Sequence, residues 1–584
     1  MAINVPQTVT FSTVCALTFV PYMAYRLLRK RAGELGPETT GAPQWVSRIY
    51  GAAITPFFRR RNAIALLVAV GLLVVFSAAL MLFKVPLKML PYDNRDELQF
   101  VVKMPPGSTI EKTSKLVAEL EKFLAAQNEV VNFQSYTGVA SPIDFNGLVR
   151  HYRLRSQGHQ ADIRINLLPK AERTMSSHDI ALRFRPQVEK IAAAHGGSVN
   201  LVEVPPGPPV LATVTAEVYG TPEMSYADLL AGAEALKARL RETDSRHLAE
   251  IEDLQEPTPE RLVFRINPEK AAANGITSQE VTNCLATALD GVSAGNLRMP
   301  GERYPLTIKL RLPYRDRNDL ERLKTLTVRG ATGEAVQLAE LGRFEKAPAE
   351  TPIMHKNLKP VVFVTAEAVG RAPGEMILAT AWQTLRRNPL PPGIRVEWAG
   401  EGEWEITLRV FRDLGIAFGA ALAGILLLLI VQTRSFRLSL IMMGAIPLTL
   451  IGIAPGFWLL NRFGADTVGE YLSPVFFTAT GMIGMIALGG IVIRNSIVLL
   501  EFIDESRRAG MPLREAVLQS GAVRFRPIML TALTTLMGAW PITLDPIFSG
   551  LAWALIFGLA ASTVFTMLVI PVIYLLIDKE KVLI

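Results

Sequence analysis

The chain has 584 residues, 50% of them hydrophobic, and a formal net charge of +8 at pH 7. Its apolar residues are concentrated in runs of about 20 or more, the length needed to cross a bilayer as a helix. This excludes an ordinary water-soluble protein and indicates an integral membrane protein. The surplus of Lys and Arg lies mostly beside the apolar runs, so it reports membrane topology and gives no reason to expect a nucleic-acid partner.

Seven apolar segments are long enough to be membrane spans. They lie at residues 6–27, 62–84, 410–432, 438–460, 474–502, 527–545 and 550–577. Basic residues cluster between the first two spans and in the segment 503–526, and such clusters mark the cytoplasmic side. We therefore expect a multi-pass protein with the hydrophilic segment 86–405 on the other side of the membrane.

The first span differs from a signal peptide. No basic residues precede its apolar core, it lacks a small-residue cleavage site, and it contains Pro21. A chain that begins on the far side of the membrane without a signal is typical of a piece of a longer protein.

The hydrophilic segment begins with two alternations of strand and helix. The first is strand 97–104, helix 109–127 and strand 130–136; the second is strand 161–168, helix 177–194 and strand 198–204. Together they predict a small split βαβ sheet of the ferredoxin type. The Pro-rich stretch 205–210 that follows is typical of an extended linker.

The same alternation then begins again. The first part is predicted to contain strand 213–220, helix 225–242 and strand 261–268. The second part is predicted to contain strand 361–369, helix 374–387 and strand 394–401. Between the two parts lies a stretch at 269–345 that we interpret as an inserted subdomain. The segment contains no P-loop, nucleophile elbow or paired-carboxylate motif, so we expect no enzyme, no catalytic residues and no cofactor. The histidines match no metal motif, so we expect no metal site. Cys15 is predicted within a membrane span and Cys284 in the hydrophilic segment, so we expect no disulfide between them.

Arg494 lies within an apolar span, where a charged side chain costs a few kcal/mol and normally faces a partner. Asn495 and Ser496 follow it. One interpretation is that the arginine extends to the lipid headgroups. The other is that it points into the helix bundle, because Ala487 and Gly490 share its helix face and small residues mark close helix packing.

The next span carries Thr531, Thr535 and Gly538 on one face, with Thr531 predicted at a depth close to that of Arg494. Such threonines often only bond to their own helix backbone, so a structural role remains open. Arginine keeps its proton in proteins, so a proton carrier here would be a carboxylate. No Asp or Glu is placed centrally in a predicted span, and we therefore expect the titrating group on another chain.

Several motifs resemble one family. The runs GIVIRNSIVLLEFIDE (490–505) and GMPLREAVLQSGAVRFRPIMLTALTTLMGAWPI (510–542) resemble the tenth and eleventh helices of resistance-nodulation-division (RND) efflux permeases. Further matches lie at 90–113, 161–177, 266–277 and 390–401. The resemblance covers nearly the whole chain but only the second half of such a permease.

The resemblance implies a membrane α-helical bundle of about seven helices with periplasmic α+β, ferredoxin-like pore subdomains and an inserted docking subdomain. Its parts would be the end of the sixth helix (1–28), a cytoplasmic linker (29–61), the seventh helix (62–85), pore subdomain 1 (86–210), pore subdomain 2 (211–268 and 346–405), the docking subdomain (269–345), helices eight to twelve (406–577) and a cytoplasmic tail (578–584).

The resemblance also implies proton antiport across the bacterial inner membrane. Arg494 matches the cation that faces aspartates of the fourth helix, Asn495 its neighbour, Thr531 the threonine of the eleventh helix, and Arg524 the arginine before it. The family's drug exporters have lysine at the first position. Implied partners are an N-terminal half carrying the intramembrane Asp pair, further copies in a trimer, a periplasmic adaptor and an outer-membrane channel.

The loop 137–150 resembles a substrate-path loop. Phe145 is the candidate contact within it, and Phe133 and Tyr136 lie beside it, although ordinary core packing is the alternative for these two. The external methionines are scattered in sequence, which favours organic, amphiphilic substrates. The alternatives are export of metal ions or lipids, or a non-transporting scaffold or regulatory subunit.

Overall fold

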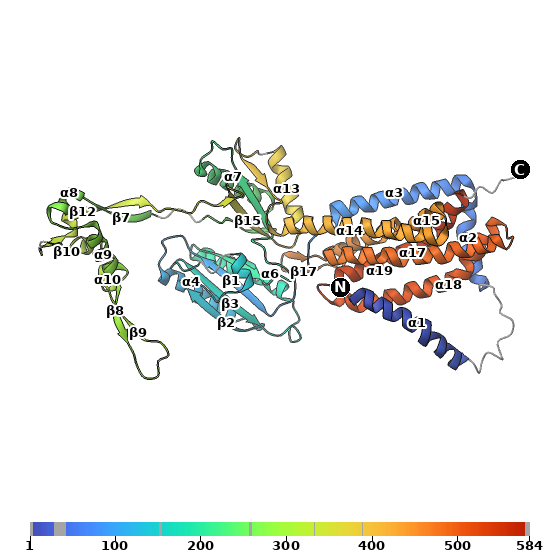
Figure 1. Cartoon of the computed structure of the whole chain (residues 1–584), viewed down its shortest axis with the longest axis horizontal. Coiled ribbons are helices and arrows are strands. Elements are labelled where there is room, and N and C mark those ends of the chain that lie inside the picture. Colours follow the sequence, from blue (N-terminus) through green and yellow to red (C-terminus); the bar gives the residue numbers. More distant parts are fainter. Residues whose placement is uncertain are drawn as a thin grey trace. The chain divides into compact units, whose positions relative to one another are not determined.

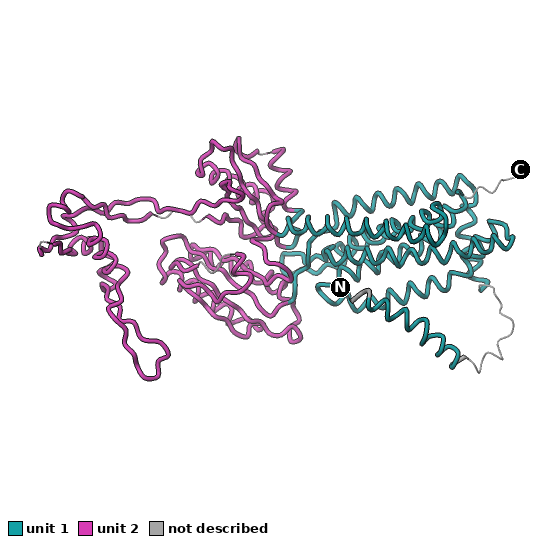
Figure 2. The backbone as a smooth tube through the Cα atoms, in the orientation of Figure 1, with its two compact units in different colours: residues 1–94, 370–375, 403–584 teal, residues 95–369, 376–402 magenta. Residues whose placement is uncertain are grey.

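The computed structural model describes residues 4–28, 43–150, 155–255, 260–331, 333–387 and 389–577. The chain forms two compact units (Figure 2). We call residues 1–94, 370–375 and 403–584 the membrane unit, and residues 95–369 and 376–402 the sheet unit. The predicted tail 578–584 and most of the first half of the predicted linker, residues 29–42, lie outside the described residues.

The membrane unit consists of long apolar helices (Figure 1). In the described residues, seven helical segments are long and apolar enough to cross a membrane. They are α1 (Asn4–Leu28), α3 (Arg60–Lys84), α14 (Gly402–Thr433), α15 (Phe436–Met443) with α16 (Pro447–Phe463), α17 (Ala479–Arg508), α18 (Leu513–Ala539) with η3 (Trp540–Leu544), and α19 (Ser549–Ile577). Each predicted apolar segment falls on one of them.

Helix boundaries differ from prediction where charged residues end an apolar run. The segment 503–526 was expected to be a loop, but α17 continues to Arg508 and α18 begins at Leu513. Arginines mark the end of an apolar segment without ending a helix, because they are good helix formers. The predicted linker 29–61 likewise contains α2 (Gln44–Ile54) and η1 (Thr55–Phe58).

Glycines allow the membrane helices to pack closely. Gly484 of α17 lies against the backbone of Leu551 in α19, and Gly558 of α19 lies against Leu488 of α17. Helix α2 packs on α18 in the same way, because the ring of Tyr50 fills the space beside Gly521. The Tyr50 hydroxyl donates to the carbonyl of Met567 at 3.1 Å, so α2 is joined to both α18 and α19.

A buried ion pair joins the segment after α3 to the start of α14. Lys88 is only 4% exposed, and its Nζ lies 3.6 Å from Glu403 Oε2 and 3.2 Å from the centroid of the Tyr92 ring. The neighbouring Leu87 forms a parallel β-bridge with Phe477, just before α17. These contacts hold the ends of three helices together.

The first sheet of the sheet unit is antiparallel with the order β2-β3-β1-β4. It contains β1 (Glu97–Lys103), β2 (Val130–Thr137), β3 (Gln160–Leu167) and β4 (Ser198–Glu203). Helices α4 (Ile110–Ala125) and α6 (Ser177–Ala194) pack on one face over a core that includes Phe100, Ile163 and Phe184. This is the predicted ferredoxin-type arrangement.

The second sheet has the equivalent order, β16-β5-β15-β6. It contains β5 (Val214–Tyr219), β6 (Leu248–Asp253), β15 (Val362–Ala368) and β16 (Arg395–Glu397), with helices α7 (Tyr226–Asp244) and α13 (Pro373–Arg386). The prediction that 261–268 is a strand of this sheet is wrong, because that place belongs to β6. The sequence of β6, LAEIED, has three carboxylates in six residues and so gave no strand signal.

The segment 261–268 instead forms most of β7 (Glu260–Ile266), which pairs with β12 (Gly342–Pro348) in a two-stranded ribbon. The ribbon leads to the inserted subdomain (Figure 1). That subdomain contains α8 (Pro268–Ala273), α9 (Ser278–Leu289), β8 (Val292–Leu297), β9 (Leu306–Leu310), α10 (Tyr314–Arg317), α11 (Leu320–Lys324), β10 (Thr327–Arg329), β11 (Ala335–Gln337) and α12 (Leu338–Leu341). Short hairpins β13 (His355–Lys356) with β14 (Lys359–Pro360), and β17 (Asp466–Val468) with β18 (Tyr471–Ser473), complete the chain.

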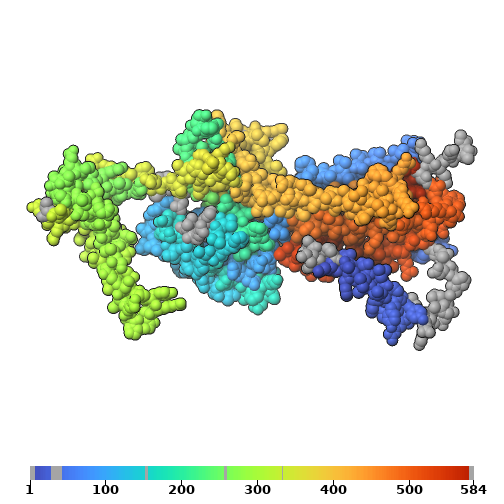
Figure 3. Space-filling view, in the orientation of Figure 1, coloured from blue at the N-terminus to red at the C-terminus, as the bar shows by residue number. Residues whose placement is uncertain are grey.

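The hairpin β8–β9 exposes apolar side chains on one face, because Leu306, Ile308 and Leu310 alternate with polar residues and lie on the same face as Val292 and Leu297. Figure 3 shows the hairpin in green as a thin arm of the sheet unit. Tyr304, Ile308 and Leu310 are among its exposed residues. A two-stranded hairpin is marginally stable by itself.

The contact between Gly521 and Tyr50 gives a stability prediction. Gly→Ala inside a helix normally stabilises by about 1 kcal/mol, but a Cβ at Gly521 would overlap the Tyr50 ring. We expect Gly521→Ala to destabilise the chain by about 1–3 kcal/mol, measured as a lower thermal unfolding midpoint in detergent. Gly71→Ala in α3 is the matched control, since no atom lies within 4 Å of its Cβ position. Equal midpoints for the two variants would contradict this packing.

Candidate functional site

Arg494 lies at the middle of α17 and on its exposed face. Ala487 and Gly490 are exposed on the same face, as the sequence predicted, while Asn495 and Ser496 are 4% and 0% exposed. The interpretation that the arginine points into the bundle is wrong for this chain. The reason is that α17 packs on α19 through the opposite face, where Gly484 and Leu488 lie.

No ion pair or hydrogen bond of Arg494 occurs within the part of the chain that the structure describes. The carboxylates of α14 and α17 lie toward helix ends and have their own contacts there. Glu501 accepts a hydrogen bond from Gln432 Nε2 at 3.0 Å, and Asp504 lies 2.5 Å from Arg508. The charge of Arg494 is therefore available to a group outside the described residues.

The predicted face of α18 is also open. Thr531 and Gly538 are exposed and Thr535 is half-buried. The Thr531 hydroxyl donates to the carbonyl of Ile528 at 2.9 Å, and that of Thr535 to the carbonyl of Thr531 at 2.8 Å. Both hydroxyl groups thus donate to the backbone of their own helix, which is the structural role considered for them above. Their oxygen atoms can still accept a hydrogen bond.

Helices α17 and α18 are neighbours, since Ser520 Oγ donates to the carbonyl of Leu499 at 3.0 Å. Arg524 of α18 lies over the ring of Phe502 of α17, 5.2 Å from its centroid. Of the four residues assigned to proton coupling, Arg494 and Thr531 are therefore exposed on neighbouring helices, Asn495 is buried, and Arg524 forms a separate contact. The structure shows no direct bond among the four within the described residues.

The loop 137–150 lies over the face of the first sheet that carries no helices. Arg164 of β3 holds it there, donating to Pro142 O at 2.8 Å and to Asp144 Oδ2 at 2.7 Å. Asp144 also caps the short helix α5 (Phe145–Val149), accepting from the amide of Gly147 at 2.5 Å. Phe145 is 67% exposed at the start of this helix.

The two aromatic residues of β2 point to opposite faces of the sheet. Phe133 packs against the core formed with α4 and α6, which is the alternative considered for it. Tyr136 donates to Gln134 Oε1 at 2.9 Å, and Gln134 faces the loop. The structure thus places Tyr136 and Phe145 on the loop side of the sheet and separates Phe133 from them.

A polar cavity of about 100 Å³ lies between the loop and the sheet. Its polar lining residues are Glu97, Gln99, Gln134, Asp144, Asn146, Arg164 and Asn166. Gln99 and Asn146 are only 6% and 8% exposed, and Gln99 Nε2, Asn146 Oδ1 and Arg164 Nε have no hydrogen-bond partner among the described residues. Unpaired polar atoms in a buried site are costly, so this cavity is suited to a ligand with both donors and acceptors.

Sequence reasoning missed this cavity. Its signal is Gln99, a polar residue inside the apolar strand LQFVV. The partners Asn146 and Arg164 come from other segments and have no distinctive spacing.

The chain matches the model of the AcrB/AcrD/AcrF family over residues 1–578. It is similar to the swarming motility protein SwrC of Bacillus subtilis, with 23% identity over 99% of this chain and 52% of the relative, and to the nickel and cobalt resistance protein CnrA of Cupriavidus metallidurans, with 25% identity over 100% and 52%. The multidrug resistance protein MdtC of Cronobacter sakazakii is 22% identical over 99% and 53%.

A crystal structure of a heavy metal efflux pump has a similar fold, with a TM-score of 0.75 and 21% identity over 92% of this chain and 52% of that one. The chain thus spans about half the length of these relatives. Because the family model extends over nearly every residue, from the first apolar helix to the last, the chain belongs to the AcrB/AcrD/AcrF family of RND permeases.

Proposed function

We propose that this chain is the C-terminal half of a proton-driven RND efflux permease and exports organic, amphiphilic compounds by proton antiport. The observation that carries the proposal is Arg494, a permanent cation at the middle of an apolar helix and on its exposed face. A charge in that position is expensive unless another chain supplies a carboxylate. The family resemblance assigns that carboxylate to an aspartate pair of the N-terminal half.

The open faces of α17 and α18 fit such a partner. No atom lies within 4 Å of a Cβ position at Gly490 or Gly538, so a further helix can approach both backbones closely. Arg494 would then hold the aspartates ionised until a proton arrives, and Thr531 would accept a hydrogen bond beside them. Proton binding neutralises the carboxylate and weakens its attraction to the arginine, which is the step that can move the helices.

The loop 137–150 and its cavity support the proposed substrate class. Exposed Phe145 offers an apolar surface, and the adjoining cavity directs the donors Gln99 Nε2 and Arg164 Nε and the acceptor Asn146 Oδ1 at a polar group. The carboxylates of Glu97 and Asp144 also line the cavity, but Asp144 is paired with Arg164. The unpaired donors and acceptor can hydrogen-bond to the oxygen or nitrogen atoms of an organic molecule. An amphiphile could place its polar head in the cavity and its apolar part on Phe145.

Metal export is the second candidate, because CnrA is a nickel and cobalt resistance protein and the similar crystal structure is that of a heavy metal efflux pump. A scaffold or regulatory subunit is the candidate from another class. We place the membrane unit in the bacterial inner membrane and the sheet unit in the periplasm. The full assembly would be a trimer with an adaptor and an outer-membrane channel.

The role of Arg494 can be tested by co-expression with the N-terminal half. Arg494→Ala should lower proton-dependent efflux by more than about a hundredfold while the halves still co-purify, since removing one partner of a buried ion pair costs about 3–5 kcal/mol, a factor of about 150 or more. Arg494→Lys should keep most of the activity. Arg526→Ala, which removes an exposed arginine of α18, is the control. Loss of co-purification alone favours the scaffold, and proton-dependent efflux by the isolated chain would refute the half-pump proposal.

The cavity gives a separate test. Gln99→Met keeps the side-chain volume but removes the donor, so the substrate concentration for half-maximal export of ethidium should rise about tenfold, as loss of a hydrogen bond in a buried site costs about 1–2 kcal/mol. Gln127→Met at the end of α4, outside the cavity, should change nothing. Export of Ni²⁺ or Co²⁺ without export of any organic dye would instead select the metal candidate.

A further inference from the structure

Two carboxylates of strand β6 in the second sheet, those of Glu250 and Glu252, contact residues of the first sheet and its helix α6. Glu250 has a φ of 54°, in the left-handed region that non-glycine residues rarely adopt. The pairing of β6 with β15 is irregular at the same place, because Thr365 pairs with Glu252 while Glu367 pairs with Ala249. Strain of this kind persists only where surrounding contacts hold it and is concentrated at functional positions.

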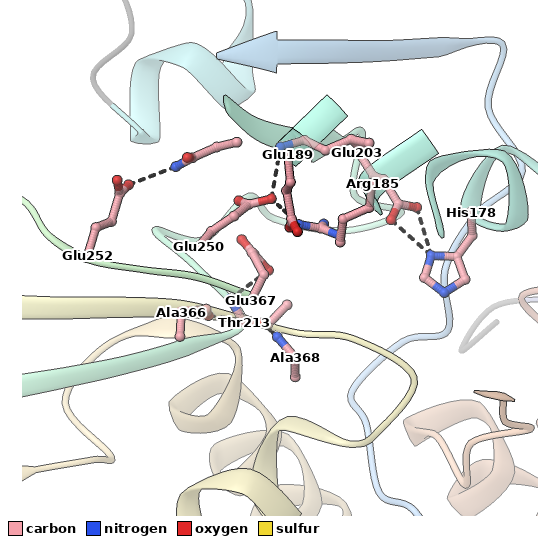
Figure 4. Close-up of polar contacts among 12 residues, drawn as sticks. His178, Arg185, Glu189, Glu203, Thr213, Glu250, Glu252, Ala366, Glu367 and Ala368 are labelled. Carbon is pink, nitrogen blue, oxygen red and sulfur yellow. Dashed lines mark hydrogen bonds and ion pairs between the residues drawn. The ribbon is translucent and has the colours of Figure 1, made fainter. Parts of the chain in front are cut away.

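Contacts with the first sheet hold Glu250 in this conformation (Figure 4). Its carboxylate forms an ion pair with Arg185 of α6 and accepts a hydrogen bond from the amide of Leu201 in β4 at 2.9 Å. The side chains of Glu250 and Arg185 are only 5% and 7% exposed. The ion pair joins β6 to α6, and removing either charge would leave the other buried without a partner.

Two further carboxylates extend the junction. Glu252 Oε1 lies 2.5 Å from Lys103 Nζ of β1 and accepts from Asn200 of β4 at 2.7 Å. Glu367 of β15 lies 3.2 Å from Arg150, the residue at the end of α5. The second sheet is thus bound through Glu250 to helix α6 and through Glu367 to the loop 137–150.

Burial and charge balance act together at Glu250. The ionisable groups that face it are Arg185 and Glu189 from α6, Glu367 from β15, and through Glu367 the guanidinium of Arg150. Burial raises the pKa of Glu250 above the ordinary value of a glutamate, attraction to Arg185 opposes this shift, and repulsion from Glu367 adds to it. Burial alone would lower the pKa of Arg185, but attraction to Glu250 raises it, so the arginine keeps its charge.

We propose that Glu250 and Glu367 form a carboxylate clasp, in which the second sheet fixes the position of both α6 and the loop 137–150 through the ion pairs Glu250–Arg185 and Glu367–Arg150. The clasp goes beyond the proposed transport function, because it concerns the ion pairs that join the two sheets of the sheet unit. It makes Arg150 and Glu367 positioning residues for the loop that carries Phe145.

Hydrogen–deuterium exchange of the purified 584-residue chain tests the positioning role. The amides of Leu148 and Arg150 are hydrogen-bonded to Asp144 and Asn146 within α5, so their exchange reports the order of the loop. Glu367→Gln should speed it about tenfold, Arg150→Gln should do the same, and the double variant should add nothing more. Asp253→Asn is the matched control, since its ion pair with Lys237 has the same 14% exposures but stays within the second sheet and its helix.

The Glu250 contact has its own test. The amide of Leu201 donates to the Glu250 carboxylate, so Glu250→Gln should speed its exchange about tenfold. Glu203→Gln, which alters the His178 pair of Figure 4, should leave that exchange unchanged. Unchanged loop exchange in Glu367→Gln, or unchanged Leu201 exchange in Glu250→Gln, would overturn the clasp. A thermal midpoint within a few degrees of wild type verifies folding of each variant, and neither result depends on transport.

Discussion

A charge removed from water needs a counter-charge, and both units of this chain are organised by the source of that counter-charge. Lys88 finds Glu403 within the membrane unit, where their pairing joins the segment after α3 to α14. Glu250 finds Arg185 across two sheets and is held in a strained backbone conformation by doing so. Arg494 forms no ion pair with a carboxylate in the described part of the chain, so its counter-charge would have to come from a partner.

Close packing at glycine decides which face of α17 stays open for its charge. Small residues on both faces of α17 made its packing direction ambiguous in sequence. Gly484 gives that direction, because it approaches the backbone of α19 and turns Gly490 and Arg494 outward. The membrane unit therefore presents a face with a cation, accepting hydroxyls and glycines, which are the features that an incoming helix with a carboxylate would require.

Much of the sheet unit could be predicted because its strands alternate clearly with helices. The pattern around Phe100 and Leu116 identified β1 and α4 within a residue or two, and the same holds for α6 and β4. Strand β6 could not be predicted, because Glu250 and Glu252 point to basic groups of the first sheet and make a strand read as a polar loop. The true second-sheet strand and the clasp were missed for one reason: the residues are paired over a long sequence distance.

The candidate sites divide in the same way. Arg494 and Thr531 could be named from sequence, since a charge in an apolar run and a threonine stripe are local patterns, but the side on which Arg494 lies could not. Gln99, Asn146 and Arg164 come from separate segments and form a cavity only after the loop folds over the sheet. The sequence by itself determined the apolar helices, the ferredoxin-type alternation of the first sheet and the family, because hydrophobic periodicity is local. Only the tertiary structure decided which polar groups meet, because burial and pairing depend on segments far apart in the chain.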